Sequence, residues 1–308
     1  MSAETVESTN FINAAMNDDL VRDRVGSLLE ISLVDRGIIS AEAVDGYLDI
    51  LGDDEASLER RAEMIRQHVI DANNPNSEYS TVYARYSSET RTAYRASLVT
   101  PFLEGAGVVL DLGTGNGRLA MEVVRSGEIQ QVIATDVHDY RTQEVKDHPQ
   151  VEFMQTDSID HLPEGSVDGV FCSLALHHVE TGKVSPLLHE IGRVLRRGGA
   201  FIVLEETPPL KDGQPLTSNK STTDLDQAFE GLAVAQQKQV LGVMDYVSNW
   251  VGNGVYDVPL PFQFHTAGEW LSLFDNANLL TESVDYYGIP SMREKFTPVP
   301  STRFVLRK

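Results

Sequence analysis

Several features that define other protein classes are scarce or absent in this chain of 308 residues. Cys172 is the only cysteine, which excludes an intramolecular disulfide framework and a zinc site built from cysteines alone. No apolar run approaches the roughly 20 residues that cross a bilayer, so we expect no contact with a membrane. The segment MSAETVESTN at the start has neither the basic region nor the apolar core of a signal peptide, and we expect a cytoplasmic protein.

Basic residues are also scarce. The chain has 25 Lys and Arg against 46 Asp and Glu, a formal net charge of -21. Such a charge repels phosphate backbones at long range, and the longest basic clusters are short pairs such as Arg196–Arg197. We therefore expect a small-molecule substrate and no nucleic acid partner. Hydrophobic residues make up 41% of the chain, enough to build a sizeable core.

The pattern of apolar residues changes along the chain. Residues 1–75 have a helical pattern and no visible chemistry, so they could form a cap or a surface for homodimerisation. Residues 76–100 form a connector rich in hydroxyls and tyrosines. From about residue 101, short apolar runs alternate with helical stretches, which is typical of a parallel sheet with crossover helices. The expected strands are residues 108–112, 131–135, 151–155, 167–173, 200–205, 281–288 and 303–306.

A long insertion at residues 207–265 separates the fifth and sixth expected strands. Its first part resembles an irregular loop, and its second part is helical from about residue 223 to 250. Loops of this length in compact domains are usually functional or disordered, and the apolar content argues against disorder. We interpret the insertion as a helical lid within a domain that covers residues 76–308.

A glycine loop follows the first expected strand. The segment Asp111-Leu-Gly-Thr-Gly-Asn-Gly117 has glycines at alternate positions, where the missing Cβ lets a ligand approach the backbone. Dinucleotide-binding folds use the spacing G-x-G-x-x-G, whose third glycine would stand at Arg118. A glycine-rich turn with no ligand is the alternative reading of this loop.

Three carboxylates accompany the loop. Asp136 ends the second expected strand, about 20 residues after the loop, where a carboxylate can accept both hydroxyls of a ribose. Asp157 follows the third strand and could bind the exocyclic amine of adenine, although an Asp–Ser pair also caps helices. Asp111 lies inside an apolar strand, where we expect it to accept hydrogen bonds from the loop backbone or to reach a ligand through water.

These segments together resemble the class I S-adenosylmethionine-dependent methyltransferases. The similarity covers residues 105–206 in register and the strands after about residue 266 more loosely. It includes residues 156–158, residues 166–179 beside the transferable methyl group, and residues 188–199 before the fifth strand. The resemblance implies an α/β, Rossmann-like fold with a seven-stranded, mostly parallel sheet, here with an N-terminal helical extension and the helical lid. It also implies S-adenosyl-L-methionine as cofactor.

The expected cofactor contacts come from the loop, the strand ends and the connector. They are Asp111, Gly113, Thr114, Gly115, Gly117, Asp136, Val137, Asp157, Ser158 and Ser173, with Tyr83 and Arg85 as candidates to close over the methionine part.

Catalytic candidates follow the fourth and fifth strands or come from the lid. His177 and His178 could supply a general base or a hydrogen-bond donor, or they could be turn histidines that pack on the sheet edge. One of Glu205 and Glu206 could face the site, and Glu206 is our candidate. His265 could reach the site from the lid. We predict no metal site, because nothing beyond the adjacency of the two histidines suggests ligand spacing.

The sequence thus predicts methyl transfer to a small molecule in specialised or biosynthetic metabolism. Two other classes stay open: a nicotinamide-dependent oxidoreductase on the same fold, and a non-catalytic scaffold protein. Arg118, in place of a third glycine, disfavours the oxidoreductase, and the intact loop with Asp136 disfavours the scaffold protein.

Overall fold

The computed structural model describes residues 3–35, 37–73, 89–126, 129–211, 213–216, 223–289 and 299–308. The chain divides into two compact units, each built from three segments. We call the first the helical unit; it comprises Met1–Thr90, Lys220–Phe264 and Gly288–Pro300. The second, the α/β unit, comprises Arg91–Asn219, His265–Tyr287 and Ser301–Lys308. Along the part of the chain that the structure describes, no helix is both long and apolar enough to span a membrane.

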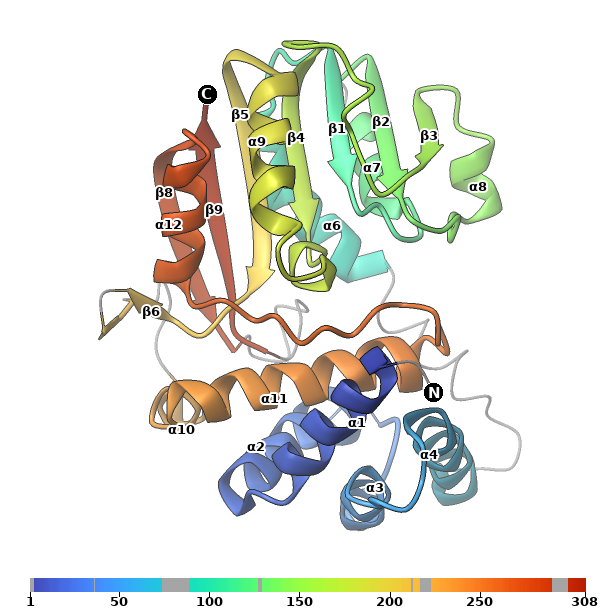
Figure 1. Ribbon diagram of the computed structural model, residues 1–308. Helices are drawn as coiled ribbons and strands as arrows, with labels where there is room; N and C mark the ends of the chain where they lie inside the picture. Colours follow the sequence, from blue (N-terminus) through green and yellow to red (C-terminus); the bar gives the residue numbers. More distant parts are fainter. Residues whose placement is uncertain are drawn as a thin grey trace. The chain divides into compact units, whose positions relative to one another are not determined.

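The α/β unit contains a seven-stranded sheet with the order β3-β2-β1-β4-β5-β9-β8 (Figure 1). Its strands are β1 (Val108–Leu112), β2 (Gln131–Asp136), β3 (Val151–Gln155), β4 (Val167–Ser173), β5 (Leu195–Glu206), β8 (Leu280–Gly288) and β9 (Ser301–Arg307). The pairs β1–β2, β1–β4, β2–β3 and β4–β5 are parallel, and β9 runs antiparallel to β5. The predicted α/β fold with a seven-stranded, mostly parallel sheet is therefore confirmed.

Helices cover both faces of this sheet. The helices and short turns of the unit are α6 (Glu89–Val99), η2 (Thr100–Phe102), α7 (Arg118–Arg125), α8 (Gln143–Lys146), η3 (Leu176–His178), α9 (Val184–Val194) and α12 (Ala267–Asn276). Apolar residues of α9 and α12 share one core cluster with Phe304 and Leu306 of β9. Because side chains alternate along a strand, Arg303 faces the other side, where it donates to the Leu98 carbonyl of α6. Two-sided burial explains why the central strands are continuous apolar runs.

Two segments of the α/β unit have more regular structure than we expected. The connector at residues 76–100 ends in the helix α6, and the irregular loop after β5 contains a small antiparallel pair, β6 (Leu210–Lys211) and β7 (Gln214–Pro215). Polar residues that alternate with few apolar ones carry little periodic signal, so neither element stands out in the sequence.

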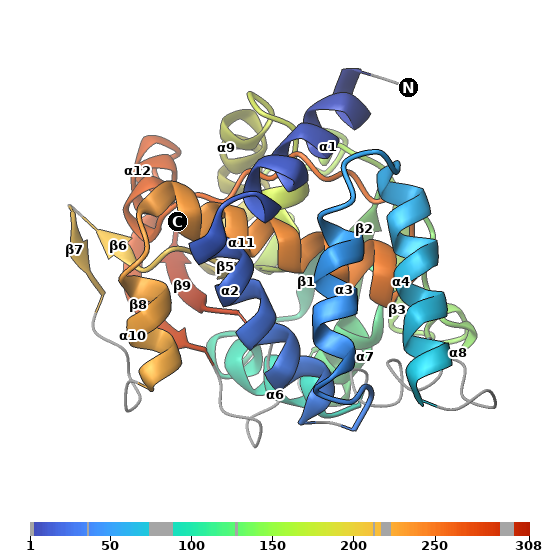
Figure 2. The ribbon, with the colours of Figure 1, turned by 90° about the horizontal axis from the view of Figure 1, so that it is seen from below.

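The helical unit has one apolar core, which residues of the N-terminal segment and of the insertion form together. Its elements are α1 (Ala3–Met16), α2 (Asp19–Leu29), η1 (Glu30–Val34), α3 (Ala43–Leu51), α4 (Leu58–Asn73), α10 (Asp224–Glu230), α11 (Val234–Tyr246) and η4 (Val247–Gly252). The helix α11 packs against α1 and α2, and its continuation η4 packs against α4 (Figure 2). The N-terminal extension and the insertion therefore share one core. From the sequence we expected them to be two separate features.

The helix expected over residues 223–250 is interrupted. Gly231 ends α10, and a new helix start follows in which the Gln236 side chain accepts a hydrogen bond from the Ala233 N–H at 3.1 Å. Glycine near a helix end and a polar residue at the third helical position are ordinary stop and start signals. The apolar residues on both sides of the break hide them in the sequence.

A buried arginine ties the helical unit together. Arg61 of α4 is fully buried and donates to the carbonyls of Ala56 and Leu51 at 3.0 and 2.9 Å. It also donates to the Asn13 side chain of α1 at 2.6 Å. The guanidinium therefore satisfies buried acceptors on two helices and on the loop between α3 and α4.

Replacing this arginine should destabilise the fold strongly. Arg61→Met leaves one buried and two part-buried acceptors without their donor, and we expect a loss of about 3 kcal/mol in the free energy of unfolding, measured by urea titration. The neighbouring Arg60 is exposed and forms a surface ion pair with Glu63, so Arg60→Met should change stability by about 0.5 kcal/mol or less. Similar losses in both variants would contradict the role of Arg61.

Candidate functional site

The order of the strands reverses between β1 and β4. The chain passes from β1 to β2 and β3 on one side, and then returns to place β4 on the other side of β1. In open parallel sheets, ligands bind beyond the carboxyl ends of the strands at such a switch point. The glycine loop follows β1 and the two histidines follow β4, so both predicted groups lie at this point.

The three positions of the loop require glycine for different physical reasons. Each has a positive φ, between 54° and 74°. A Cβ on Gly113 would lie 2.4 Å from the Ala175 Cβ, and one on Gly117 would lie 2.5 Å from a methyl group of Val145. Within the part of the chain that the structure describes, no atom lies within 4 Å of where a Cβ on Gly115 would stand. Packing within the protein therefore explains Gly113 and Gly117, whereas Gly115 borders open space that a ligand can use.

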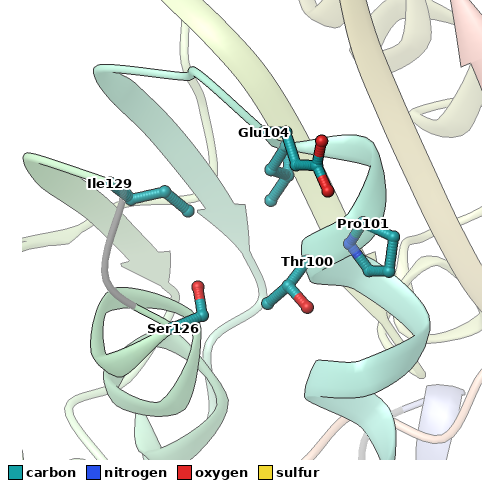
Figure 3. A pocket seen from close by; sticks show the side chains of 6 residues that line it. Thr100, Pro101, Glu104, Ser126 and Ile129 are labelled. Atoms are coloured by element: carbon teal, nitrogen blue, oxygen red, sulfur yellow. The ribbon is translucent and has the colours of Figure 1, made fainter.

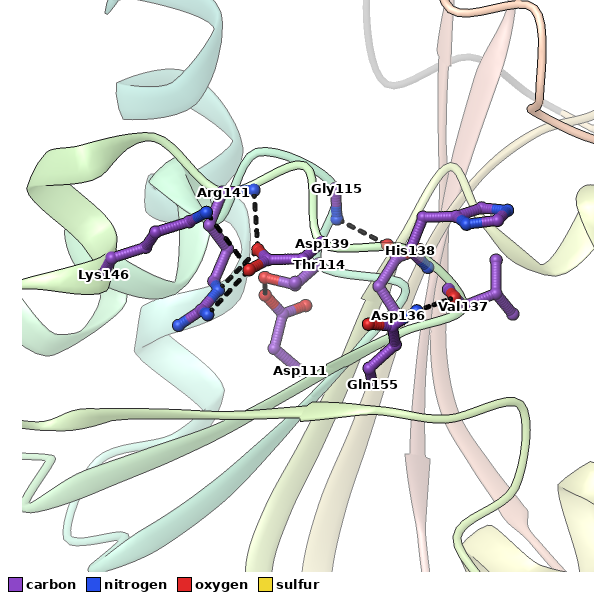
Figure 4. A network of polar contacts seen from close by, with 10 residues as sticks. All are labelled: Asp111, Thr114, Gly115, Asp136, Val137, His138, Asp139, Arg141, Lys146 and Gln155. Atoms are coloured by element: carbon purple, nitrogen blue, oxygen red, sulfur yellow. Dashed lines mark hydrogen bonds and ion pairs between the residues drawn. The ribbon is translucent and has the colours of Figure 1, made fainter.

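Asp136 connects the loops that follow three neighbouring strands (Figure 4). Its carboxylate accepts a hydrogen bond from the Gly115 N–H at 2.8 Å and another from the His138 N–H at 3.3 Å. Its backbone carbonyl accepts the Thr156 N–H at 2.8 Å. These bonds hold a carboxylate beside the open position at Gly115, and each carboxylate oxygen keeps a lone pair for a ligand hydroxyl.

A second carboxylate, Asp111, lies beneath the loop. It is buried, and its partner is the Thr114 hydroxyl at 2.5 Å, a side chain of the loop where we had expected backbone groups (Figure 4). Burial raises the pKa of Asp111 to about 7, the Thr114 hydrogen bond opposes this shift, and the nearby Asp136 charge adds to it. Near neutral pH the charge of this carboxyl therefore depends on small changes in its surroundings.

The segments after β2 and β3 present the other predicted cofactor contacts. Val137 follows Asp136 and is 42% exposed, an unusual position for a large apolar side chain. Asp157 is exposed, and the Ser158 hydroxyl accepts a hydrogen bond from the Asp160 N–H at 3.1 Å. Ser158 thus stabilises a turn. This region offers an apolar surface and a carboxylate next to Asp136.

A short turn follows β4 and contains the two histidines. The Ser173 hydroxyl at the end of β4 has no hydrogen-bond partner among the described residues although it is buried. His177 is buried, and its Nδ1 lies 2.5 Å from the Glu205 carboxylate of β5. The His178 ring packs at 4.2 Å from the His177 ring and is less buried. Glu205, one of the two glutamates at the end of β5, thus contacts a histidine of this turn. Adjacent strand residues face opposite sides of the sheet, and the sequence does not show which of Glu205 and Glu206 faces the turn after β4.

Residues 110–203 match a family described as methyltransferase domain. The match begins in β1 and ends within β5, and it includes the ends of β1, β2, β3 and β4. This segment is therefore a methyltransferase domain. The family, and the cofactor class that it brings, agree with the resemblance found in the sequence.

The methyltransferase domain has a curated relative from Desulfotalea psychrophila, the ubiquinone/menaquinone biosynthesis C-methyltransferase UbiE. The two are 33% identical over 113 residues, which are 35% of this chain and 45% of the relative. The similarity therefore spans less than half the length of that relative.

Solved structures of methyltransferases are also similar. An S-adenosylmethionine-dependent methyltransferase from Mesorhizobium loti is 21% identical over 70% of this chain and 96% of its own, with a TM-score of 0.47. The 1,6-didemethyltoxoflavin-N1-methyltransferase of Burkholderia thailandensis, solved with bound 1,6-didemethyltoxoflavin and S-adenosylhomocysteine, is 17% identical over 82% of this chain and 91% of its own, with a TM-score of 0.48.

The remaining predicted site residues lie elsewhere in the chain. Tyr83 and Arg85 fall outside the described residues. His265 belongs to the α/β unit and not to the insertion helices; its ring packs edge-on against Trp270 of α12 at 4.7 Å. Glu206 is buried at the end of β5. Catalytic roles for His265 and Glu206 stay predictions.

The α/β unit also has a small pocket of about 190 Å³, which is separate from the candidate site (Figure 3). Its lining residues are Thr100, Pro101, Leu103, Glu104, Ser126 and Ile129. These residues precede β1 and β2, whereas the glycine loop and Asp136 follow the same strands. The pocket therefore lies at the opposite edge of the sheet and takes no part in the site.

The raised pKa of Asp111 predicts a pH-dependent stability. The folded state holds the proton up to about pH 7, but the unfolded chain releases it near pH 4. The stabilisation by the neutral form is therefore complete below pH 4 and is lost as the pH rises to 7. Asp111→Asn keeps an acceptor for Thr114 and cannot ionise. Its stability relative to the native protein should rise by on the order of 1 kcal/mol or more between pH 5 and pH 8. Urea titrations at the two pH values measure this, and an equal difference at both would contradict the assignment.

Proposed function

We propose that this protein transfers the methyl group of S-adenosyl-L-methionine to a small-molecule acceptor. One observation carries the proposal: the open space beside Gly115 adjoins the Asp136 carboxylate at the strand-order switch point. A nucleoside whose ribose lies against Asp136 fits this arrangement, because the missing side chain at Gly115 gives room for close approach to the backbone.

The residues of the site fit S-adenosyl-L-methionine in kind and position. Asp136 would hold the ribose hydroxyls, and Val137 with Asp157 would hold the adenine ring and its amine. The buried Ser173 hydroxyl, unpartnered among the described residues, would face the methionine part together with the loop. When bound, the cofactor supplies an electrophilic methyl group on a sulfonium. The protein must mainly align the acceptor with that methyl group and exclude water.

Two observations support a small-molecule acceptor. The net charge of -21 opposes the approach of nucleic acid. The curated relative, by its name, acts in ubiquinone and menaquinone biosynthesis, which concerns small molecules. We propose a role in biosynthetic or specialised metabolism on this basis. A homodimer through residues 1–75 and a cytoplasmic location stay predictions.

His178 is our preferred candidate for a general base. It follows β4 at the switch point and is more exposed than His177. A base assists methyl transfer when the acceptor is a hydroxyl or an activated carbon. Glu206 and His265 are further candidates.

A nicotinamide-dependent oxidoreductase is the competing function on this fold. Arg118 stands where the third glycine of that fingerprint belongs, and it is the first residue of α7. A non-catalytic scaffold is less well supported, since it needs neither the open position at Gly115 nor the carboxylate beside it.

Calorimetric titration with S-adenosylmethionine, S-adenosylhomocysteine and NAD tests the proposal. We expect micromolar binding of the first two and none of NAD. In Gly115→Val the new side chain fills the open space, so affinity for S-adenosylhomocysteine should fall at least about tenfold. Asp136→Ala should weaken binding by a similar factor.

Gly105→Val is the matched control for Gly115→Val. Gly105 also has a positive φ, 73°, and a Cβ there would meet no atom of the described residues within 4 Å. It precedes β1, at the edge of the sheet away from the loop. Both variants therefore carry similar backbone strain, and only Gly115→Val should lose binding. Equal affinities in the two variants, or binding of NAD alone, would count against the proposed function.

The base assignment predicts a separate effect on turnover. With an acceptor found by screening for S-adenosylhomocysteine release, His178→Asn should lower kcat by roughly 100-fold or more, because proton removal loses its catalyst. Its affinity for S-adenosylhomocysteine should stay within about twofold of the native value. An unchanged kcat would transfer the role to Glu206 or His265, or show that no base is used.

A further inference from the structure

The turn after β4 contains a strained residue. Leu174 has a φ of 56°, in the left-handed region that side-chain-bearing residues seldom adopt. This conformation is unfavourable for an L-residue, because its Cβ lies too close to the following carbonyl oxygen. Such residues persist only where the surrounding structure holds them in place. The turn therefore needs a feature that fixes it.

Glu205 is that feature. Its side chain is fully buried at the end of β5, the strand beside β4. One carboxylate oxygen accepts hydrogen bonds from the N–H groups of Ala175 and Leu176, at 3.1 and 2.7 Å. The other oxygen faces His177 Nδ1 at 2.5 Å. Three donors from consecutive residues thus converge on one carboxylate, immediately after the strained position.

The turn after β4 packs closely against the glycine loop. The strands β1 and β4 are neighbours in register, with Leu112 opposite Cys172, so the segments that follow them lie side by side. Only a glycine at position 113 avoids the Ala175 methyl group, which lies 2.4 Å from where a Cβ would stand. A shift of Ala175 would therefore change the space available to the loop.

We propose that Glu205 is a positioning residue, which fixes the turn after β4 against the glycine loop and so sets the affinity for the cofactor. This inference rests on the proposed function. His177 is the partner that orients Glu205. His177 is therefore a positioning residue as well, and His178 stays the candidate base. Removing the carboxylate frees the N–H groups of Ala175 and Leu176 and lets Leu174 relax from its strained φ. The turn would then move away from the geometry that the loop requires.

A matched carboxylate exists at the other edge of the same sheet. Asp168, at the start of β4, accepts hydrogen bonds from the N–H groups of Gly107 and Val108 at 2.6 and 2.8 Å. Its second oxygen pairs with Arg196 at 2.5 Å. It therefore fixes two backbone N–H groups and one cation, as Glu205 fixes two N–H groups and a histidine, but far along the strand from the loop. A purely structural loss should look the same at both positions.

The test compares Glu205→Ala, Glu205→Gln and Asp168→Ala in the full chain. Affinity for S-adenosylhomocysteine is measured by calorimetry, well below the lowest Tm of the set. Glu205→Ala should bind at least tenfold more weakly than the native protein. Glu205→Gln keeps an amide oxygen for the two N–H groups and should stay within about threefold. Asp168→Ala should lower Tm but keep the native affinity within about twofold. Equal losses in Glu205→Ala and Asp168→Ala, or no loss in Glu205→Ala, would overturn the proposal.

The histidine partner has a readout of its own. A hydrogen bond from an imidazole N–H to a carboxylate at this distance shifts the proton resonance far downfield. The resonance should be present in the native protein and absent in both Glu205→Gln and His177→Asn; its persistence in either variant would refute the contact. If Glu205→Ala does not fold, His177→Asn replaces it, with an expected loss in affinity of at least threefold and an unchanged affinity as the refuting result. Native affinity is measured first: a native chain that does not bind contradicts the proposed function, whereas differences among the variants judge Glu205 alone.

Discussion

The reversal of strand order at β1 and β4 is the constraint on which the α/β unit depends. Because the connections from these two neighbours leave in different directions, the space beyond their carboxyl ends cannot be filled by a single crossover. The chain borders that space with a loop whose glycines adopt positive φ and with a turn that contains a strained leucine. The Asp136 carboxylate then joins the loop to the next strand end. Every proposed cofactor contact within the described chain follows from this arrangement.

Much of this arrangement could be predicted from residue patterns alone. The central strands are buried on both faces and appear as continuous apolar runs. All seven strands lie where the sequence predicts them, although β5 begins five residues earlier than expected. The glycine loop and Asp136 were predictable because backbone geometry and ligand shape impose strict requirements at a few positions. Asp111 was expected to need a partner, and its burial confirms that need, but the identity of the partner, Thr114, depends on side-chain geometry within the loop.

Other features depend on contacts that no local pattern encodes. Glu205 and Glu206 are adjacent and identical, and only the three-dimensional structure shows that Glu205 accepts hydrogen bonds from the turn after β4. The interruption of the insertion helix at Gly231 is local, but apolar residues on both sides conceal it. The N-terminal helices and the insertion share one apolar core, and a hydrogen bond at 2.8 Å between Gln236 and Asp18 also joins these two distant segments. Periodicity predicts which residues are buried, but it does not identify the segments that pack against them.

The division of the helical unit into three chain segments has a consequence for biosynthesis. The N-terminal helices leave the ribosome long before the residues of α10 and α11 that complete their core, and all of Arg91–Asn219 is translated in between. During that interval the nascent chain exposes the apolar faces of α2 and α3, a situation in which chaperones bind and aggregation competes with folding. For the same reason, cutting the chain at any one point leaves at least one unit incomplete, and neither unit can be obtained as a simple truncation.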